Sequence, residues 1–323
     1  MMETEQKTPF FRQTWFLGGI AALVIFALCF IAIDYAGSPD EPKKPEVEKA
    51  VIATIQSNEP LINIARQQGW IAPDATEMTT LDALAVDSIG TVFSGSNLQS
   101  FQEFRHFICV QEIKAGAFAH ANALKDVVVP ANVVTIEDGA FADCPALEDL
   151  QVDTANTHYD SRNNCHAILC TWKGKLMVVA GCKNTVLLPD VRYLAPQAFA
   201  GCTALKEIIF PERLEEMGAQ AFRNCTSLTE VTIPQGVRFI EDGTFMGCTS
   251  LRKVILSKSV ERLRREAFKD CAQLTEMVVP KKFPPIIEHA FDDYTATIYV
   301  PDGQIDAYFR DKEWKKFNNI KEQ

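Results

Sequence analysis

The stretch "AFKDCAQLTEMVVP" (residues 267–280) decides the fold, because almost the same phrase, "AFRNCTSLTEVTIP", stands at residues 221–234. The two copies begin 46 residues apart, which is twice an interval of 23 residues. Self-similarity at a fixed period of about 20–50 residues is the signature of a stacked repeat architecture. The chain is therefore expected to fold as a series of similar coils.

Phenylalanine marks this repeat along most of the chain. The marked residues are Phe118, Phe141, Phe199, Phe222, Phe245, Phe268 and Phe291. Every interval is 23 residues except that from Phe141 to Phe199, which is 58. A leucine follows each of the first six by six residues: Leu124, Leu147, Leu205, Leu228, Leu251 and Leu274. The pattern therefore predicts regular coils with one interruption.

A strand-like phrase comes after each of these leucines and at two further places. The phrases are "VVVP", "LQVD", "VLLP", "IIFP", "VTIP", "VILS", "MVVP" and "IYVP". Their alternation has the period of two that is typical of a strand, and proline lacks the N–H that would continue a ladder. One coil cannot bury its apolar residues alone, whereas stacked coils can. We expect the eight phrases to form one parallel sheet.

The repeat "L-x-x-V-x-I-P-x-x-V-x-x-I-x-x-x-A-F-x-x-C-x-x-L" resembles the BspA-type leucine-rich repeat family of bacterial surface proteins, over about Ser88 to Val300. The resemblance implies a right-handed solenoid outside the cell that serves in binding or adhesion, without catalysis. It also implies that "YDSRNNCHAIL…LMVVAGCKNTVLLP" is a variant coil. The predicted fold class is α/β, mainly β: a leucine-rich-repeat solenoid with a parallel sheet, helical caps at both ends and one N-terminal transmembrane helix.

The two ends of the solenoid need caps. We assign residues 51–110 to an N-terminal cap, 111–302 to the repeats with a hairpin insert at about 154–183, and 303–323 to a C-terminal cap. The last segment is expected to be a short helix that turns its aromatic residues onto the final coil: Tyr308, Phe309, Trp314 and Phe317. Residues 74–85 are similar to a degenerate calcium loop. Thr79 and Ala85, however, replace the turn glycine and the bidentate glutamate, which argues against calcium.

An uncharged run of 19 residues extends from Trp15 to Ile33. About 20 apolar residues cross a bilayer, so we predict a single-pass anchor at 15–36, with a cleaved secretion signal as the alternative. Lys7 and Arg12 precede the run, and the positive-inside rule then makes residues 1–14 a cytoplasmic tail. Residues 37–50 read as a linker, and the bulk of the chain is expected to be extracytoplasmic, in the periplasm or at the cell surface.

Charge and catalytic motifs narrow the function. The net charge is −10 and the pI about 5.1, which argues against a nucleic-acid partner. The five histidines (His106, His120, His158, His166 and His289) lie in no nucleophile elbow or metalloprotease motif, and no phosphate-binding glycine loop is present. We therefore predict no enzyme activity, no cofactor and no metal. An active site assembled across coils remains the alternative.

The cysteines fall into two groups. Cys144, Cys202, Cys225, Cys248 and Cys271 each follow a phenylalanine by three residues and are expected to be buried, reduced thiols. In the insert, a Lys173-Gly174 turn would place Trp172 opposite Lys175, Cys170 opposite Met177 and Cys165 opposite Cys182. This register predicts a Cys165–Cys182 disulfide. A zinc site from Cys165, His166, Cys170 and Cys182 is the rival hypothesis.

The outer face of the strands carries the candidate binding surface. Two residues after the strand-leading leucines stand Asp126, Asp149, Glu207, Glu230, Lys253 and Glu276. The five acidic residues form either a docking stripe for a basic partner or a solvated face. Beside them, outward apolar residues are predicted: Val128, Ile209, Ile255 and Val278.

The favoured function is a membrane-anchored module that binds a protein or glycan ligand. A periplasmic scaffold that assembles other membrane proteins is the alternative, followed by an enzyme.

Overall fold

The structure, a computed structural model, describes residues 54–55 and 58–323. They belong to one compact unit, Ile52–Gln323. The predicted tail, anchor and linker (1–50) lie outside these described residues. Within the described part of the chain, no helix has the length and the apolar character needed to cross a membrane.

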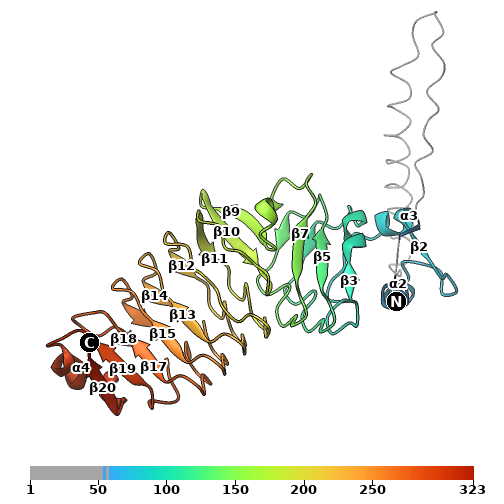
Figure 1. Cartoon of the computed structure of the whole chain (residues 1–323). Coiled ribbons are helices and arrows are strands. Elements are labelled where there is room, and N and C mark those ends of the chain that lie inside the picture. The colour runs from blue at the N-terminus through green and yellow to red at the C-terminus, as the bar shows by residue number, and fades with distance from the viewer. Residues whose placement is uncertain (1–53, 56–57) are drawn as a thin grey trace, which may run out of the picture. The chain divides into compact units, whose positions relative to one another are not determined.

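Parallel strands of the repeat phrases form two sheets (Figure 1). The first has the order β3 (Ser100–Phe101), β5 (Asp126–Val129), β7 (Asp149–Val152). The second has the order β13 (Glu230–Thr232), β15 (Lys253–Ile255), β17 (Glu276–Val278), β19 (Thr297–Val300), β20 (Asn319–Glu322). Within it, Val231 pairs with Val254 and Val254 with Met277, so the register follows the sequence repeat. The chain is thus a mainly β, parallel-sheet solenoid.

A second row of short strands follows the first around each coil. It contains the sheet β4 (Glu112–Ile113), β6 (Thr135–Ile136), and the sheet β14 (Phe239–Ile240), β16 (Arg262–Leu263), β18 (Ile286–Ile287). Between them lies the sheet β8 (Tyr159–Asp160), β9 (Ile168–Trp172), β10 (Lys175–Ala180), β11 (Val191–Leu194), β12 (Glu216–Met217). Because β10 pairs parallel with β11, the insert joins this second row.

The repeated phenylalanines stack on one another through the core. Ring centroids of Phe222 and Phe245 lie 5.5 Å apart with planes 9° from parallel, and those of Phe245 and Phe268 lie 5.6 Å apart at 12°. Phe118 and Phe141 stack at 4.9 Å in the N-terminal half. Backbone hydrogen bonds fix the same spacing, since Phe245 N–H donates to Ala267 O at 2.9 Å. Each coil therefore completes the burial of the one before it.

A left-handed residue precedes each of the seven phenylalanines and another follows the first six, a feature that the repeat pattern did not predict. The residues two before the phenylalanines have φ of 56° to 72°: Gly116, Gly139, Gln197, Gln220, Gly243, Glu266 and His289. The residues two after have φ of 57° to 74°: His120, Asp143, Gly201, Asn224, Gly247 and Asp270. Gly, Asn, Asp and His tolerate this conformation better than most residues, which accounts for the second set. His120 and His289 are thus turn residues.

The predicted hairpin is present. β9 and β10 are antiparallel, with Trp172 opposite Lys175 and Cys170 opposite Met177. Lys173 and Gly174 both have positive φ (50° and 73°), as a two-residue type I′ turn requires. The insert also contains the 3-10 helix η3 (Arg162–Asn164).

The prediction of one continuous eight-strand sheet is wrong. The phrases at 186–189 and 208–211 form no strand, so the sheet is interrupted between β7 and β13. The interruption follows the insert, where the chain enters the second row of strands and the next two coils lose the strand pairing of the first row. The core divides correspondingly into two clusters, and Met177 of the hairpin packs against both.

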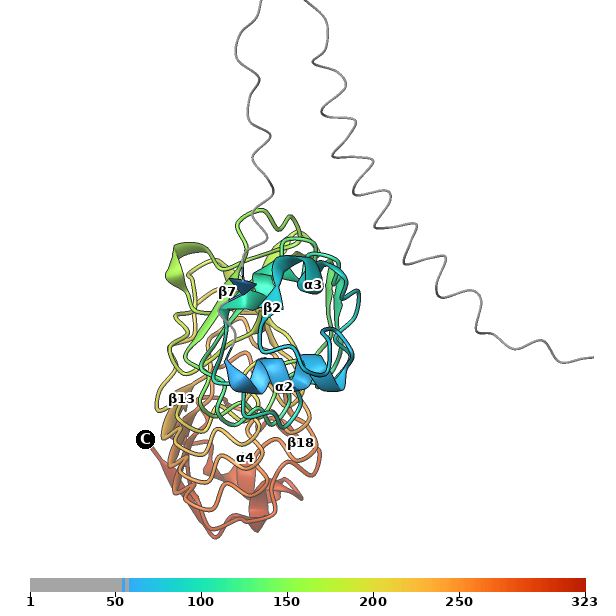
Figure 2. The ribbon, with the colours of Figure 1, turned by 90° about the vertical axis from the view of Figure 1, so that its right-hand side faces the viewer.

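The N-terminal region begins with the antiparallel pair β1 (Thr54–Ile55) and β2 (Met78–Thr79). It continues with α2 (Glu59–Gln67), α3 (Thr80–Leu84) and the 3-10 helix η2 (Gln102–His106). Figure 2 views the coils nearly end-on and shows α2 and α3 at this end. The segment that is similar to a calcium loop thus forms β2 and α3, with a Thr79–Asp82 capping box.

The C-terminal region contains α4 (Ile305–Arg310) and the 3-10 helix η4 (Trp314–Lys316), and it ends in β20, a strand that was not predicted. Tyr308, Trp314 and Phe317 are buried, whereas Phe309 is 46% exposed, contrary to expectation. Tyr308 OH donates to Lys281 O (2.9 Å) and Trp314 Nε1 to Pro285 O (2.6 Å), which ties both rings to the last coils.

Removal of one ring from the stack tests the importance of the phenylalanine ladder. Phe245→Ala is expected to lower the free energy of unfolding by about 3–5 kcal/mol, because a cavity opens between two neighbouring rings. Phe309→Ala, the matched exposed change, should cost far less. Urea titration of the full-length protein in mild detergent, followed by tryptophan fluorescence, measures both values. Equal losses of unfolding free energy in the two variants would contradict a stabilising role of the phenylalanine ladder.

Candidate functional site

Asp126 and Asp149, the first two members of the predicted stripe, lie opposite each other on β5 and β7. Both carboxylates are engaged within the protein. Asp126 Oδ1 accepts from Ser100 Oγ at 2.6 Å, and Asp149 Oδ1 lies 2.8 Å from His166 Nδ1. Gln151 Nε2 also donates to Asp149 (2.6 Å). These contacts stabilise two like charges that would otherwise repel, so this end of the stripe is structural.

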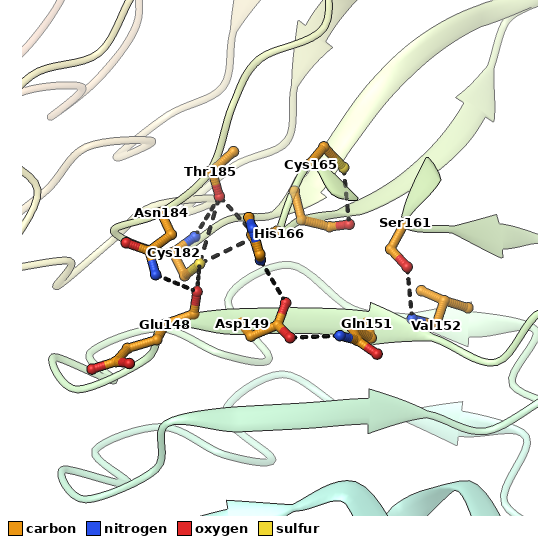
Figure 3. A network of polar contacts seen from close by, with 11 residues as sticks. Glu148, Asp149, Gln151, Val152, Ser161, Cys165, His166, Cys182, Asn184 and Thr185 are labelled. Carbon is orange, nitrogen blue, oxygen red and sulfur yellow. Dashed lines mark hydrogen bonds and ion pairs between the residues drawn. The ribbon is translucent and has the colours of Figure 1, made fainter. Parts of the chain in front are cut away.

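A polar network joins β7 to the insert (Figure 3). Thr185 Oγ1 donates to His166 O at 2.9 Å and accepts from Cys182 N–H at 2.8 Å. Cys182 Sγ donates to Glu148 O (3.0 Å) and His166 O (3.2 Å), and Asn184 Nδ2 donates to the same Glu148 oxygen (3.1 Å). The network satisfies the backbone carbonyls where the first sheet stops.

The predicted Cys165–Cys182 disulfide is not formed, and both cysteines are free. The reason is a register shift in the hairpin: Val178 pairs with Leu169, but Ala180 pairs with Ile168. Below this bulge the two cysteines are no longer opposite each other. Cys165 packs in the C-terminal core cluster and Cys182 in the N-terminal one.

Cys182, His166 and Asp149 have the composition of a nucleophile, a base and an orienting acid, but not the geometry of a catalytic triad. The Cys182 thiol is fully buried, and this burial raises its pKa to about 11. Its hydrogen bonds go to backbone carbonyls, one of them of His166 itself. A protonated, inaccessible thiol is inert, so the cluster is structural. Among residues 54–55 and 58–323, no three His, Cys, Asp or Glu side chains are placed to hold a metal ion, and the rival zinc set is not assembled.

The cysteine ladder has a regular role. Sγ of Cys225, Cys248 and Cys271 each donates, at 3.2 Å, to the carbonyl of the phenylalanine one coil earlier. Cys144 Sγ does the same to Phe118 O at 3.0 Å. All ladder thiols are free. Desolvation by burial raises their pKa values, so they remain protonated donors.

The other end of the stripe differs. Glu207 and Glu230 are exposed, and among the described residues neither forms an ion pair or a side-chain hydrogen bond. Between them lies a groove of about 860 Å³, bordered by residues 207–212 on one side and 229–235 on the other. We call it the acidic groove, because Glu207, Glu212 and Glu230 line it. Glu276 lies two strands away on β17, beyond Lys253.

Apolar side chains also line the acidic groove. Ile209 is 84% exposed, and Ile208, Phe210 and Ile233 contribute to the lining. A second groove of about 640 Å³ lies on the other side of residues 207–210 and includes Val186, which is 61% exposed. The predicted apolar row is otherwise incomplete, because Val128 is buried (5% exposed).

A smaller pocket of about 400 Å³ lies beside the hairpin. Trp172 and Tyr193 meet edge to face there, with centroids 5.0 Å apart. Asp138 and Glu241 also line it, and desolvation by burial raises the pKa of both carboxyls. Lys173 Nζ already lies 3.6 Å from the Trp172 ring centroid, so the protein itself occupies one face of this aromatic pair.

Sequence reasoning identified Glu207, Glu230 and Ile209 but missed the groove that joins them. It also missed Val186 and Phe210, whose phrases read as ordinary strands. The sequence feature that could have indicated this groove is the position of the two phrases, which come directly after the insert.

Comparisons with known proteins agree with the repeat. The family described as the BspA type leucine-rich repeat region matches in six copies, over residues 86–167 and 180–297. A search of curated proteins gave no match.

Three solved structures are similar to this chain. A leucine-rich cell surface protein from Faecalibacterium prausnitzii is 17% identical, with a TM-score of 0.48 over 69% of this chain and 62% of that one. A leucine-rich repeat protein from Eubacterium ventriosum is 22% identical, with a TM-score of 0.45 over 54% and 53%. The pneumococcal vaccine antigen PcpA is 17% identical, with a TM-score of 0.46 over 67% and 66%. The chain spans about three fifths of the first protein's length and about half of the second's.

The ladder thiols predict a loss of stability at high pH. Burial raises the pKa of Cys144 and Cys271 to about 12, from an ordinary value of 9.0. Because the folded pKa is the higher one, their stabilising contribution is complete below pH 9 and is lost as the pH rises towards 12. The free energy of unfolding should fall by about 1.4 kcal/mol per pH unit for each thiol.

Urea titrations between pH 8 and 11 check this expectation. The free energy of unfolding of a Cys144→Ala, Cys271→Ala double variant should fall less steeply with pH. Cys109 lies outside the ladder, so Cys109→Ala serves as the control and should leave the slope unchanged. An unchanged slope in the double variant would contradict the assignment.

Proposed function

The chain belongs to the BspA-type leucine-rich repeat family, and we propose that it is a membrane-anchored, extracytoplasmic module that binds a protein or glycan ligand through its repeat surface. Repeats of this family form a scaffold that interacts with other proteins, so we propose binding without catalysis.

The anchoring part of the proposal comes from the sequence. The uncharged run Trp15–Ile33 is long enough to cross a bilayer, and the basic residues Lys7 and Arg12 precede it. This arrangement orients the repeats away from the cytoplasm. Residues 37–50 would separate them from the membrane.

The binding part depends on one observation: the acidic groove combines exposed apolar area with carboxylates that have no partner among the described residues. A solubility face would have scattered charges and apolar residues covered by neighbours. Ile209 between Glu207 and Glu230 fits an interaction surface better, since apolar area rimmed by polar groups marks such sites.

A periplasmic scaffold that assembles other membrane proteins is the second candidate. The length of the linker favours it in a cell with two membranes. Residues 37–50, fully extended, reach at most about 50 Å. This length limits how far from the anchoring membrane the repeats can begin. In a cell with one membrane, the same linker permits exposure at the surface.

Protease treatment of cells that make the full-length protein tests the location. We expect an added protease to digest the repeats on intact cells while a cytoplasmic protein stays intact. Digestion only after the outer envelope is permeabilised would favour the scaffold over surface binding. Protection of the repeats under both conditions, with the cytoplasmic control also protected, would contradict an extracytoplasmic location altogether.

A further inference from the structure

The acidic groove is an opening between two neighbouring coils of the stack. At one end, Thr229 N–H donates to Lys206 O at 3.3 Å. Beyond this contact, no backbone hydrogen bond joins the described residues 207–212 to residues 230–235. At the other end the coils meet again, because a Cβ on Gly236 would lie only 2.1 Å from Leu214 O. The opening therefore has two closed ends.

One side of this opening is an unpaired strand edge. Just before β13, Thr229 O accepts from Lys253 N–H, and just after it, Ile233 N–H donates to Ile255 O, so these groups face β15. Main-chain groups alternate between the two sides of a strand, and those of Glu230 and Thr232 consequently face the opening. Among the described residues, neither Glu230 N–H nor Thr232 N–H has a partner in residues 206–212. Such an edge is a template for another strand.

The side chains define what would fit this edge. On β13, Val231 is buried and Glu230 and Thr232 are exposed, so side chains alternate between the core and the outer face. A strand added here would direct alternate side chains towards Ile208, Phe210 and Ile233, and the others outward, beside Glu207 and Glu230. The first set must be apolar and the second set basic.

We propose that the acidic groove binds an extended segment of a protein partner by strand addition to β13, with basic and apolar residues alternating along that segment. The proposal rests on the proposed binding function and names the partner's chemistry. Main-chain hydrogen bonds to Glu230 and Thr232 supply affinity, and the alternating side chains supply specificity. The free edge, Glu230–Thr232, spans roughly 10 Å, so it pairs with about three residues of that segment.

A labelled (Lys-Val)₃ peptide probes the groove of the full-length protein in mild detergent, by fluorescence anisotropy. We expect saturable binding that weakens as salt increases. The same peptide with N-methyl groups on alternate backbone nitrogens keeps its charge but loses the strand hydrogen bonds, and it should bind roughly tenfold more weakly or not at all. A (Glu-Val)₃ peptide should not bind.

Paired variants locate the binding. The double variant Glu207→Lys, Glu230→Lys should lower the affinity for the peptide by roughly tenfold or more. Asp87→Lys with Asp302→Lys makes the same change in net charge at exposed residues elsewhere and should have little effect. Ile209→Lys should weaken binding, whereas Ile286→Lys, at a residue that is 51% exposed on β18, should not. Every substituted position is exposed, so the variants are expected to fold.

Equal binding of the N-methylated and unmodified peptides would overturn strand addition and leave only charge attraction. Equal effects of the two lysine pairs, or no binding of the peptide at all, would overturn the assignment to this groove. The proposed location is tested separately: peptide binding by a protein whose repeats resist protease on both intact and permeabilised cells would refute the extracytoplasmic location and support the groove.

Discussion

The structure depends on the fact that one coil of 23 residues cannot bury its own phenylalanine. From Phe199 to Phe291, each ring stacks on the ring of the next coil, at centroid distances of 5.1 to 5.6 Å. This stacking requires every coil to keep the same register, and the register in turn brings the strands into parallel pairs and the cysteine thiols beneath the preceding carbonyls. The left-handed residues on both sides of the first six phenylalanines turn the chain into and out of the core at the same places in these coils.

The insert between Phe141 and Phe199 is compatible with this constraint because the coils remain in contact past it. Asp143 N–H donates to Ala200 O at 2.8 Å, and Arg223 forms a 2.6 Å ion pair with Asp143 across the intervening Gly201, where a side chain would collide with Asp143. The insert does, however, disturb the strand pairing: the first-row sheet is interrupted between β7 and β13, and the acidic groove opens there. The irregular coil therefore creates the surface that the regular coils do not have.

Much of this fold could be predicted from the sequence, because burial and periodicity are local signals: the spacing of Phe222 and Phe245 alone indicates that their rings are neighbours. The hairpin turn at Lys173-Gly174 was predictable for the same reason. The missing strands at 186–189 and 208–211 were not, because strand pairing depends on a neighbour, and these phrases read as normal strands. The Cys165–Cys182 error has a similar origin, since a one-residue bulge near Val179 leaves no mark in the composition but changes every partner beyond it. The residues of the acidic stripe were predicted from the sequence. Which of their carboxylates are hydrogen-bonded and which have no partner was not predictable, because it depends on contacts between distant residues such as His166 and Asp149.

The two core clusters have a mechanical consequence. With Cys165 and Cys182 unlinked, no disulfide among the described residues holds the halves of the solenoid together across the insert. Tension applied between the two ends of the repeats is carried by strand ladders from β3 to β7 and from β13 to β20. Between these ladders it is carried by the hairpin sheet, the Arg223–Asp143 pair and backbone bonds such as that from Asp143 N–H to Ala200 O. We therefore expect the stretch between β7 and β13 to yield first under force, while the ladders on both sides stay intact.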